Sequence, residues 1–377
     1  MQGAATCVDN STGNVVAIVG SRSQEDIKGY VLNRAYQSYR QPGSCIKPLN
    51  VYTPYLQLGN TPDTKVTDSQ IDGGPANADA SYAGEMTLTD AVKWSKNTVA
   101  WNIYQQITPK TGSSFLIKMG FHKIWVDKDY NAGALGGFTY GVTTEEMAGG
   151  YAALANDGVY RKATCIRLIV DASNKTVVNE TNRDSKVYDK SASRMMTQML
   201  REVVLSGTGT SANVENAVVA GKTGTTNASK DVWFCGYSKY YTTTVWAGYD
   251  YPKEMSGVNS RVNAIFKDFM TAVHTNLPVT DFSTVTQQTT QPETTAAVQE
   301  ETESLPQETT AIVPETTGIE QVTPQQVPST TAQVPTTTPY QRWTTAPAQP
   351  KTTAPMQYGD IDATTRTDPD ATARGEW

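Results

Sequence analysis

The pattern of hydrophobic and polar positions divides the chain near residue 280. Before that point, apolar, aromatic and glycine residues are mixed with polar ones as in a globular domain. From Asp281 onward the sequence consists mainly of Thr, Pro, Gln, Glu and Ala, and short Glu-Thr-Thr units recur. Such a composition cannot bury enough apolar surface to offset the loss of chain entropy. We therefore predict a folded domain over residues 1–278 and a disordered tail over residues 279–377.

Within the folded part, the periodicity of apolar residues predicts strands near both ends and helices between them. A hairpin is expected over residues 4–20, because two apolar runs flank a turn that contains glycine. Thr87 and Thr143 are each followed three residues later by an acidic residue, as in a helix cap. The helices are expected over about 44–58, 86–112 with a break in the middle, 143–158, 191–205 and 260–277, and the later strands over about 216–226, 231–238 and 240–250.

This order of elements favours an α+β fold. A strand hairpin, a block of helices, further strands and a final helix do not follow the strict alternation of strand and helix that builds a parallel sheet. We expect an antiparallel sheet that is built from both ends of the chain and flanked by helices, with a mainly helical lobe inserted between its strands. A cleft between that lobe and the sheet is the expected position of a functional site.

Charge is distributed unevenly between the two parts of the chain. Residues 281–377 contain 4 basic and 13 acidic residues, whereas the rest has a small positive excess of about 3. An acidic tail is repelled by phosphate, and a nearly neutral body offers it little attraction. We therefore expect no nucleic-acid partner.

Cysteine usage and hydropathy give two further expectations. The cysteines are far apart and form no C-x-x-C motif, so we expect free and mostly buried thiols at Cys7, Cys45, Cys165 and Cys235. The sequence has no signal peptide and no apolar run of about 18 residues, the length of a membrane span. Since the chain begins almost inside a predicted strand, we expect further sequence upstream, and any membrane anchor with it.

The sequence offers lysine rather than histidine as a catalytic base. The two histidines, His122 and His274, lie in no metal-ligand or Ser-His-Asp pattern, and we expect neither a metal nor another cofactor. Ser44 and Lys47 form the single S-x-x-K motif of the chain, and residues three apart share one face of a helix. The pair suits a nucleophile and its base, but it also fits an ordinary helix start with an exposed lysine.

Two other motif types occur twice each, and their contexts differ. Of the S-x-N triplets, Ser95–Asn97 lies at a break between helices, where Asn97 could cap the second helix, whereas Ser211–Asn213 lies in a loop rich in glycine and serine. Of the K-T-G triplets, Lys110–Gly112 follows a proline and is interpreted as a helix stop. Lys222–Gly224 continues an apolar run, so we expect a strand along which a substrate backbone can lie.

The ordered set of S-x-x-K, S-x-N and K-T-G resembles the signature of the transpeptidase domain of class A penicillin-binding proteins, in the penicilloyl-serine transferase superfamily. The resemblance extends to the stretches NRAYQSYRQPGSCIKPL, TLTDAVKWSKNTVAWN, TYGVTTEEMAGGYAALANDGVY and VAGKTGTTNASKDVWFCGYS, and it covers about residues 1–275. That family carries a glycosyltransferase domain and a membrane anchor upstream, and we expect neither within residues 1–377. The polar tail is more loosely similar to C-terminal extensions of some Gram-positive members.

The resemblance implies a serine-type transpeptidase or carboxypeptidase that acts on peptidoglycan stem peptides ending in D-Ala-D-Ala. Ser44 would attack the penultimate carbonyl to form an acyl-enzyme, with neutral Lys47 as the base. Asn97 would hold Lys47 and bind the substrate amide, and Ser95 would relay the proton to the leaving amine. The amine of a neighbouring stem would then take the acyl group and form a crosslink, whereas β-lactams would leave the serine acylated.

The K-T-G strand is implied to bind the substrate. Lys222 would supply positive potential, and the hydroxyls of Thr223 and Thr225 would hold the terminal carboxylate, with Gly224 between them. The oxyanion would lie between the backbone N–H groups of Ser44 and Thr225.

The resemblance also implies a location and partners. The protein would act at the extracytoplasmic face of the bacterial cell membrane or in the cell-wall space, and only a segment upstream of Met1 would attach it to the membrane. Its expected partners are peptidoglycan stem peptides, β-lactam antibiotics, and cell-wall, divisome or elongasome proteins.

Three alternatives stay open. Cys45 could be the nucleophile, although a helix turns its side chain about 100° away from that of Ser44. A β-lactamase would need a carboxylate that activates water, and Glu145 and Glu146 are the candidates, although both also suit a helix N-terminus. A non-catalytic β-lactam sensor would keep the serine and signal through a partner.

Overall fold

The computed structural model describes residues 1–23, 29–179 and 184–284. Most of the predicted disordered tail lies outside these described residues.

The first tail residues that the structure describes still contact the domain. Phe282 packs edge-on against Tyr237, with 5.5 Å between the ring centroids. The Tyr240 hydroxyl lies 2.8 Å from Thr280 Oγ1. The domain boundary at residue 278 stays a prediction, and these contacts favour a position further along the chain.

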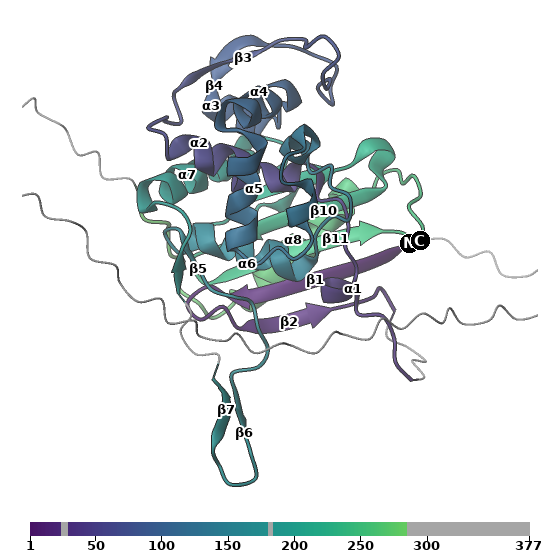
Figure 1. Cartoon of the computed structure of the whole chain (residues 1–377), viewed down its shortest axis with the longest axis vertical. Helices are drawn as coiled ribbons and strands as arrows, with labels where there is room; N and C mark the ends of the chain where they lie inside the picture. Colours follow the sequence, from purple (N-terminus) through teal and green to yellow (C-terminus); the bar gives the residue numbers. More distant parts are fainter. Residues whose placement is uncertain (24–28, 180–183, 285–377) are drawn as a thin grey trace, which may run out of the picture. The chain divides into compact units, whose positions relative to one another are not determined.

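A five-stranded antiparallel sheet with the strand order β2-β1-β11-β10-β9 lies at the centre of the domain (Figure 1). Its strands are β1 (Gln2–Asp9), β2 (Val15–Val19), β9 (Ala220–Thr225), β10 (Asp231–Tyr237) and β11 (Tyr241–Gly248). β1 pairs with β11 from Gln2, opposite Gly248, onward. The predicted antiparallel sheet from both ends of the domain is thus confirmed.

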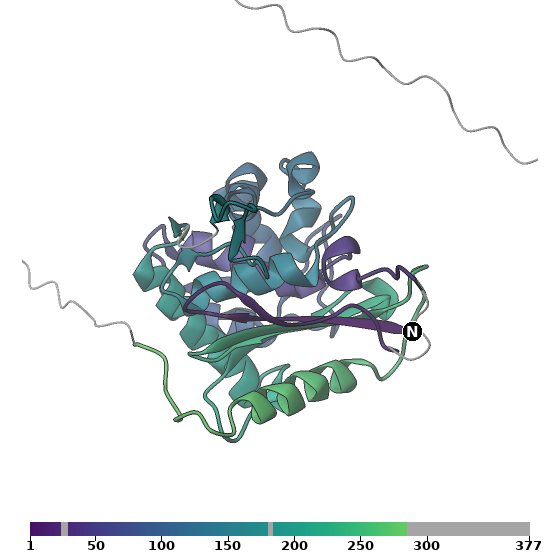
Figure 2. The same ribbon diagram turned by 90° about the horizontal axis from the view of Figure 1, so that it is seen from below.

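Helices cover both faces of the sheet (Figure 2). α6 (Thr144–Ala155) and α7 (Lys190–Ser206) pack on one face, and α8 (Asn259–Val273) packs on the other. The strand β10 between them has the sequence DVWFCGY, and all of its residues are buried. Phe234 of this strand contacts Phe266 of α8, with 4.6 Å between the ring centroids. Aromatic and β-branched side chains fit such a pleated, covered surface, which explains why this segment is a strand.

The predicted α+β fold with an inserted, mainly helical lobe is also confirmed. The remaining α-helices are α1 (Arg34–Gln37), α2 (Thr53–Leu56), α3 (Leu88–Lys93), α4 (Asn97–Ile107) and α5 (Pro109–Lys118). The 3-10 and π turns are η1 (Gly43–Ile46), η2 (Pro48–Tyr52), η3 (Ile124–Asp127), η4 (Asn131–Leu135), η5 (Thr210–Ala212) and η6 (Asn227–Ser229).

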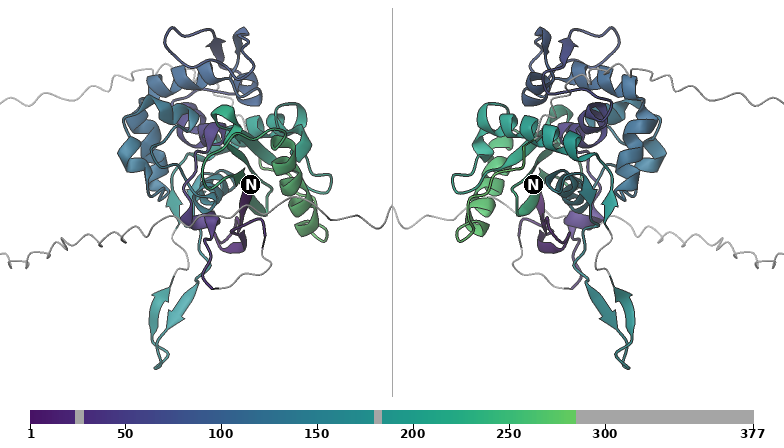
Figure 3. Two further views of the ribbon diagram at one scale, coloured as in Figure 1. Left: turned by 90° about the vertical axis from the view of Figure 1, so that its right-hand side faces the viewer. Right: turned by 90° about the vertical axis from the view of Figure 1, so that its left-hand side faces the viewer.

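Three small two-stranded sheets were not expected from the sequence. They are β3 (Lys65–Asp68) with β4 (Gly84–Thr87), β5 (Val159–Tyr160) with β8 (Ser185–Lys186), and β6 (Leu168–Val170) with β7 (Thr176–Asn179). The β6–β7 hairpin projects away from the sheet and helices (Figure 3). These strands are short and mostly exposed, so they leave little periodic signal in the sequence.

Helix caps fix several of the boundaries. The Thr87 side chain accepts a hydrogen bond from Asp90 N and starts α3. Thr143 and Glu146 form a complete capping box at the start of α6. Both predicted caps are confirmed.

The structure corrects one prediction at α5. The segment Lys110–Gly112, interpreted as a helix stop, lies in the first turn of this helix. The Thr108 side chain accepts a hydrogen bond from Thr111 N at 3.2 Å, and Pro109 occupies the first turn, where its missing N–H costs little. The proline thus belongs to a helix start.

The predicted state of the cysteines is confirmed, because all four are free and three of them are buried. The exception is Cys165, which is exposed. Among the described residues, no helix is long and apolar enough to cross a membrane.

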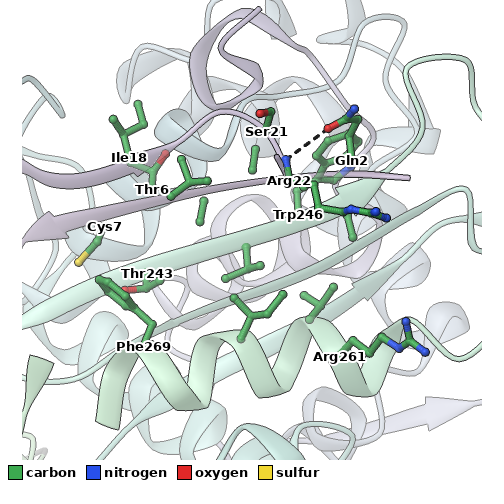
Figure 4. Close-up of a pocket in the computed structure, with 18 of the residues that line it drawn as sticks. Gln2, Thr6, Cys7, Ile18, Ser21, Arg22, Thr243, Trp246, Arg261 and Phe269 are labelled. Carbon is green, nitrogen blue, oxygen red and sulfur yellow. Dashed lines mark hydrogen bonds between the residues drawn. The ribbon is translucent and has the colours of Figure 1, made fainter. Parts of the chain in front are cut away.

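An apolar groove lies between α8 and the face of the sheet formed by β1, β2 and β11 (Figure 4). Its volume is about 350 Å³, and its lining includes Ile18 on the sheet side and Phe269 on the helix side. It shares no lining residue with the cleft described below.

Candidate active site

The three candidate motifs meet at one cleft of about 690 Å³. Ser44 of the S-x-x-K motif lines it, together with Ser95 and Asn97 of the S-x-N motif and Thr223 and Thr225 of β9. These segments are far apart in the sequence, so their meeting is a property of the fold. The structure therefore brings the predicted site residues to one place.

Ser44 lies in a helical segment whose winding changes along its length. The segment runs as a 3-10 turn from Gly43 to Ile46, as a π turn from Pro48 to Tyr52, and then as α2. Gly43 has a φ of +52°, and a Cβ added to it would lie 2.8 Å from the Thr225 carbonyl oxygen. Glycine at this position therefore allows the start of the segment to lie directly against β9.

The Lys47 side chain is fully buried and has close partners. Its Nζ lies 2.7 Å from Asn97 Oδ1 and 2.9 Å from the Ser95 carbonyl oxygen, with longer contacts to Lys96 O at 3.4 Å and Ser95 Oγ at 3.5 Å. A neutral amine has two N–H donors, and the two short contacts use both. Its lone pair is then free to accept a proton. An ordinary helix start with an exposed lysine is excluded.

Burial lowers the pKa of Lys47 well below its ordinary value of 10.5, and the positive charge of Lys222 lowers it further. Burial also lowers the pKa of Lys222, to about 8, although the thiols of Cys45 and Cys235 oppose this shift. The burial of Lys47 and the positive charge of Lys222 therefore both disfavour a charged amine at position 47. Within the described part of the chain, the Ser44 hydroxyl makes no hydrogen bond of its own.

A strained turn presents the S-x-N motif to Lys47. Ser95 has a φ of +58°, in the left-handed region that non-glycine residues rarely adopt. This turn separates α3 from α4, so that the Ser95 carbonyl and the Asn97 side chain both reach Lys47. Such strain is often found at functional sites.

The expected capping role of Asn97 is wrong. Asn97 is the first residue of α4 and not its cap, and the capping position is occupied by Lys96, which makes no side-chain cap bond. The Asn97 side chain is engaged elsewhere, because Oδ1 accepts from Lys47 and Nδ2 donates to Ala76 O at 2.9 Å.

β9 forms the far wall of the cleft. It is the last strand of the sheet, so one of its edges has no strand neighbour. Lys222 is fully buried, and its Nζ donates to Thr223 O at 3.2 Å. The hydroxyl of Thr223 lies 2.7 Å from that of Thr208, and the hydroxyl of Thr225 donates to Asn259 Oδ1 at 3.3 Å. The hydroxyls of Thr223 and Thr225 therefore line the cleft, whereas the buried Lys222 of the same strand is not among its lining residues.

The other K-T-G triplet and the other S-x-N triplet lie outside the cleft. Gly112 of the first K-T-G triplet packs against Tyr104 inside the helical lobe. Ser211 of the second S-x-N triplet lies in the η5 turn and accepts a hydrogen bond from Asn263 Nδ2 at 2.9 Å. Neither triplet lines the cleft.

Cys45 points away from the cleft. Its thiol is buried and donates to the Lys222 carbonyl oxygen at 3.1 Å.

We expect Cys45→Ala to keep the same fraction of β-lactam-acylated protein as the unmodified chain, while stability falls by about 1 kcal/mol through the lost packing. Intact-protein mass spectrometry after penicillin treatment, together with a thermal melt, measures both. Loss of the adduct in folded Cys45→Ala would restore the thiol as a candidate nucleophile.

The candidate carboxylates for a β-lactamase are engaged at a helix start. The Glu146 carboxylate accepts from Thr143 N at 2.9 Å and from His122 N at 2.8 Å. Its expected capping role is therefore confirmed. Burial and the neighbouring Glu146 raise the pKa of Glu145. Among the described residues that line the cleft, none is Asp or Glu.

Several cleft residues were missed by the sequence analysis. They include Asn77, Trp94, Thr208, Asn259 and Asn263. They come from loops and from α8, and no motif or periodic pattern marks them. Only the folded chain shows that they line the same cleft as Ser44.

Comparison with known proteins identifies the family. Residues 3–271 match the family model of the penicillin-binding protein transpeptidase domain. The chain belongs to this family. Penicillin-binding protein 4 of Bacillus subtilis is 34% identical over 265 residues, which is 69% of this chain and 42% of that protein. Penicillin-binding protein 1F of the same organism is 35% identical over 283 residues, covering 72% and 38% respectively.

Solved structures share the fold of this transpeptidase domain. Penicillin-binding protein 1A of Haemophilus influenzae superposes with a TM-score of 0.60 at 25% identity, over 75% of this chain and 49% of that one. PonA1 of Mycobacterium tuberculosis, solved in complex with penicillin V, superposes with a TM-score of 0.62 at 22% identity, over 74% and 80%. The chain is thus a penicillin-binding transpeptidase domain related to class A proteins, and it spans about two fifths of the length of the curated relatives it matches.

Proposed function

We propose that this domain is a DD-transpeptidase that crosslinks peptidoglycan stem peptides through an acyl-serine intermediate and is acylated by β-lactams. The observation that carries the proposal is the fully buried Lys47, with its pKa lowered by burial and its two short hydrogen bonds to the S-x-N motif. A serine hydroxyl is a poor nucleophile unless a nearby base takes its proton. Lys47 is suited to be that base for Ser44.

In the acylation step, Ser44 Oγ bonds to the carbonyl carbon of the penultimate D-alanine, and its proton moves to Lys47 Nζ. The carbon–nitrogen bond to the terminal D-alanine then breaks. The leaving amine takes up the proton through Ser95 Oγ, which lies 3.5 Å from Lys47 Nζ. The N–H groups of Ser44 and Thr225 are proposed to bind the oxyanion.

Substrate binding is assigned to β9. Lys222 supplies positive potential for the terminal carboxylate, and Thr223 and Thr225 offer hydroxyl donors on the cleft wall. Gly224 allows β9 to lie close to the segment that carries Ser44, because it has no side chain. The amide of Asn97 remains within reach of the substrate backbone, since it also lines the cleft.

In the second step, an amine of a neighbouring stem peptide attacks the acyl-enzyme carbonyl, and the ester bond to Ser44 breaks. The attacking amine gives a proton to Lys47, which is neutral again after acylation, and Lys47 passes that proton to Ser44 Oγ as the ester bond breaks. If water takes the place of the amine, the same steps give a carboxypeptidase. We propose that the crosslink is the main product.

The lining of the cleft supports slow rather than fast deacylation. A β-lactamase needs a carboxylate to activate water against the acyl-enzyme. The described cleft residues include no carboxylate, and Glu146 is held in its capping box. A long-lived penicilloyl-enzyme is therefore expected.

Membership of the family supports a location at the cell wall. We propose that the domain acts at the extracytoplasmic face of the bacterial membrane or in the cell wall, attached through sequence upstream. Cell-wall, divisome or elongasome proteins are its proposed partners.

Labelling with benzylpenicillin tests the proposal. Intact-protein mass spectrometry is expected to show one penicilloyl adduct, peptide mapping is expected to place it on Ser44, and a chromogenic β-lactam is expected to show no rapid turnover. Heat-unfolded protein is the control and is expected to stay unmodified. A donor stem peptide with an acceptor amine is then expected to give a crosslinked product. An adduct on another residue would contradict the site, rapid hydrolysis would indicate a β-lactamase, and labelling without crosslinking would indicate a sensor.

A further inference from the structure

The β3–β4 hairpin lies beside α3 and α4 (Figure 1). The loop between its strands contacts the S-x-N motif through a buried polar cluster. Its centre is Asp68, the last residue of β3, which is fully buried. The carboxylate accepts hydrogen bonds from Thr98 Oγ1 at 2.5 Å, Asn77 Nδ2 at 2.6 Å and Ala83 N at 2.9 Å, and it lies 3.2 Å from Lys96 Nζ. A buried carboxylate with four donors around it is rigidly held, because each lost bond would leave a polar group unsatisfied.

Asn77 connects this cluster to the start of α4. Its Oδ1 accepts from Asn97 N at 2.7 Å and from Thr98 N at 3.3 Å. Its Nδ2 donates to Asp68 and to Ser81 O at 2.8 Å. Since α4 has no side-chain cap of its own, Asn77 satisfies the first N–H groups of the helix from outside.

The neighbouring backbone determines how the Asn97 amide is turned. Its Nδ2 donates to the Ala76 carbonyl oxygen at 2.9 Å, so its Oδ1 must face the other way, toward Lys47. A flipped amide would place N–H groups against the lysine amine. The position of Ala76 depends in turn on Asn77, its chain neighbour.

We propose that Asp68 and Asn77 are positioning residues of the active site, which hold Asn97 so that its Oδ1 fixes the Lys47 amine for proton transfer from Ser44. This inference rests on the proposed function of Ser44 and Lys47. Neither residue touches the reacting atoms, and both act through Asn97.

The charge of the cluster supports this arrangement. Burial raises the pKa of Asp68, but the hydrogen bonds from Thr98, Ala83 and Asn77 outweigh that effect, so the pKa lies below its ordinary value of 3.8. The carboxylate therefore stays an acceptor throughout the neutral range. Lys96 balances its charge and also pairs with Asp79 at 3.0 Å.

Two variants and one matched control test the proposal. Asp68→Asn weakens the centre of the cluster without changing its size, and Asn77→Ala removes the cap of α4. Asp79→Asn is the control, because Asp79 pairs with the same lysine but is half-exposed and makes no bond to Asn77 or Thr98. The benzylpenicillin concentration dependence of acylation gives the binding constant and the first-order rate separately.

We expect the first-order rate to fall about tenfold in Asp68→Asn and Asn77→Ala, with binding little changed, because a misplaced base slows chemistry more than recognition. The lysine also loses an acceptor that stabilises its charged form. The acid limb of the rate profile should therefore move to lower pH in both variants, an effect that general loosening does not produce. Asp79→Asn should keep the rate and the profile of the unmodified protein.

The outcomes separate this inference from the proposed function. A thermal melt first selects the variants that fold, and Asn77→Ala, on a loop outside the hydrophobic core, serves if Asp68→Asn does not fold. Unaltered rates and profiles in folded variants would overturn the inference, as would an equal loss in Asp79→Asn. Failure of the unmodified protein to acylate at Ser44 would instead overturn the proposed function.

Discussion

Replacing Lys47 with methionine should lower the rate of Ser44 acylation by about 10²- to 10⁴-fold, the usual contribution of a general base. Methionine fills a similar volume in the buried site but cannot take the proton. Stopped-flow measurement with a fluorescent penicillin gives the rate. In the unmodified protein the rate should rise about tenfold per pH unit below the pKa of Lys47 and then level off, because only the neutral amine acts as a base. Lys47→Met should lose this dependence.

The same variant should be more stable at neutral pH. The folded protein lowers the pKa of Lys47 from 10.5, so in the window between the folded and the unfolded values the unfolded chain binds an extra proton. Stability of the unmodified protein therefore rises with pH through that window. The stabilising effect of Lys47→Met should be greatest at low pH and shrink toward pH 10.5. Denaturant unfolding of both proteins at several pH values measures this difference in stability. Lys222 is present in both proteins, so its own titration does not contribute to the difference. A variant that acylates at the normal rate would remove Lys47 from the mechanism.

Replacing Gly224 with alanine should lower acylation by about 10²-fold, the cost expected for a displacement of about 1 Å near the reacting groups. A Cβ at this position would lie 2.4 Å from Pro42 O and 2.8 Å from Cys45 Sγ. Pro42 O belongs to the backbone and cannot turn aside, so β9 would have to move away from Ser44. The forced packing should also destabilise the domain by about 1–3 kcal/mol. Penicillin labelling rates and denaturant melts measure the two effects.

Gly3→Ala is the matched control for this variant. Gly3 lies in β1 of the same sheet, and a Cβ there would meet its nearest neighbour, Trp246 O, at 3.4 Å, an ordinary contact distance. Its acylation rate should stay that of the unmodified protein. Equal losses in the two variants would show that the sheet is sensitive to any added methyl group, and that the close approach of β9 has no special role.

The parts of the fold that could be predicted depend on local signals. The strand at Ala220–Thr225 and the helix that begins at Thr144 follow from an apolar run and from a cap that lies next to the helix in sequence. The β3–β4 hairpin depends instead on Asp68, whose partners are up to 30 residues away. This polar segment shows no periodic pattern for such a network, so the sequence analysis predicted no strand there.

The active site also combines features that local sequence signals predict with features that depend on distant residues. The order and context of the motifs separated Lys222–Gly224 from its copy, and the resemblance then implied roles for each residue. The sequence suggested that Asn97 caps a helix, because asparagine often does so. That prediction was wrong because a distant residue, Asn77, provides the cap and leaves the Asn97 side chain for Lys47. Competition between partners of this kind is decided by tertiary structure.

The tight 3-10 winding of η1 has a consequence for the geometry of the nucleophile. In a 3-10 helix residues three apart are eclipsed along the axis, whereas at 100° per residue in an α-helix they are offset by about 60°. Overwinding at Gly43–Ile46 therefore turns Lys47 into the same angular sector as Ser44, and the underwound π turn that follows returns the chain to the path of α2. The alignment of base and nucleophile is thus built into the backbone pitch as well as into the choice of side chains.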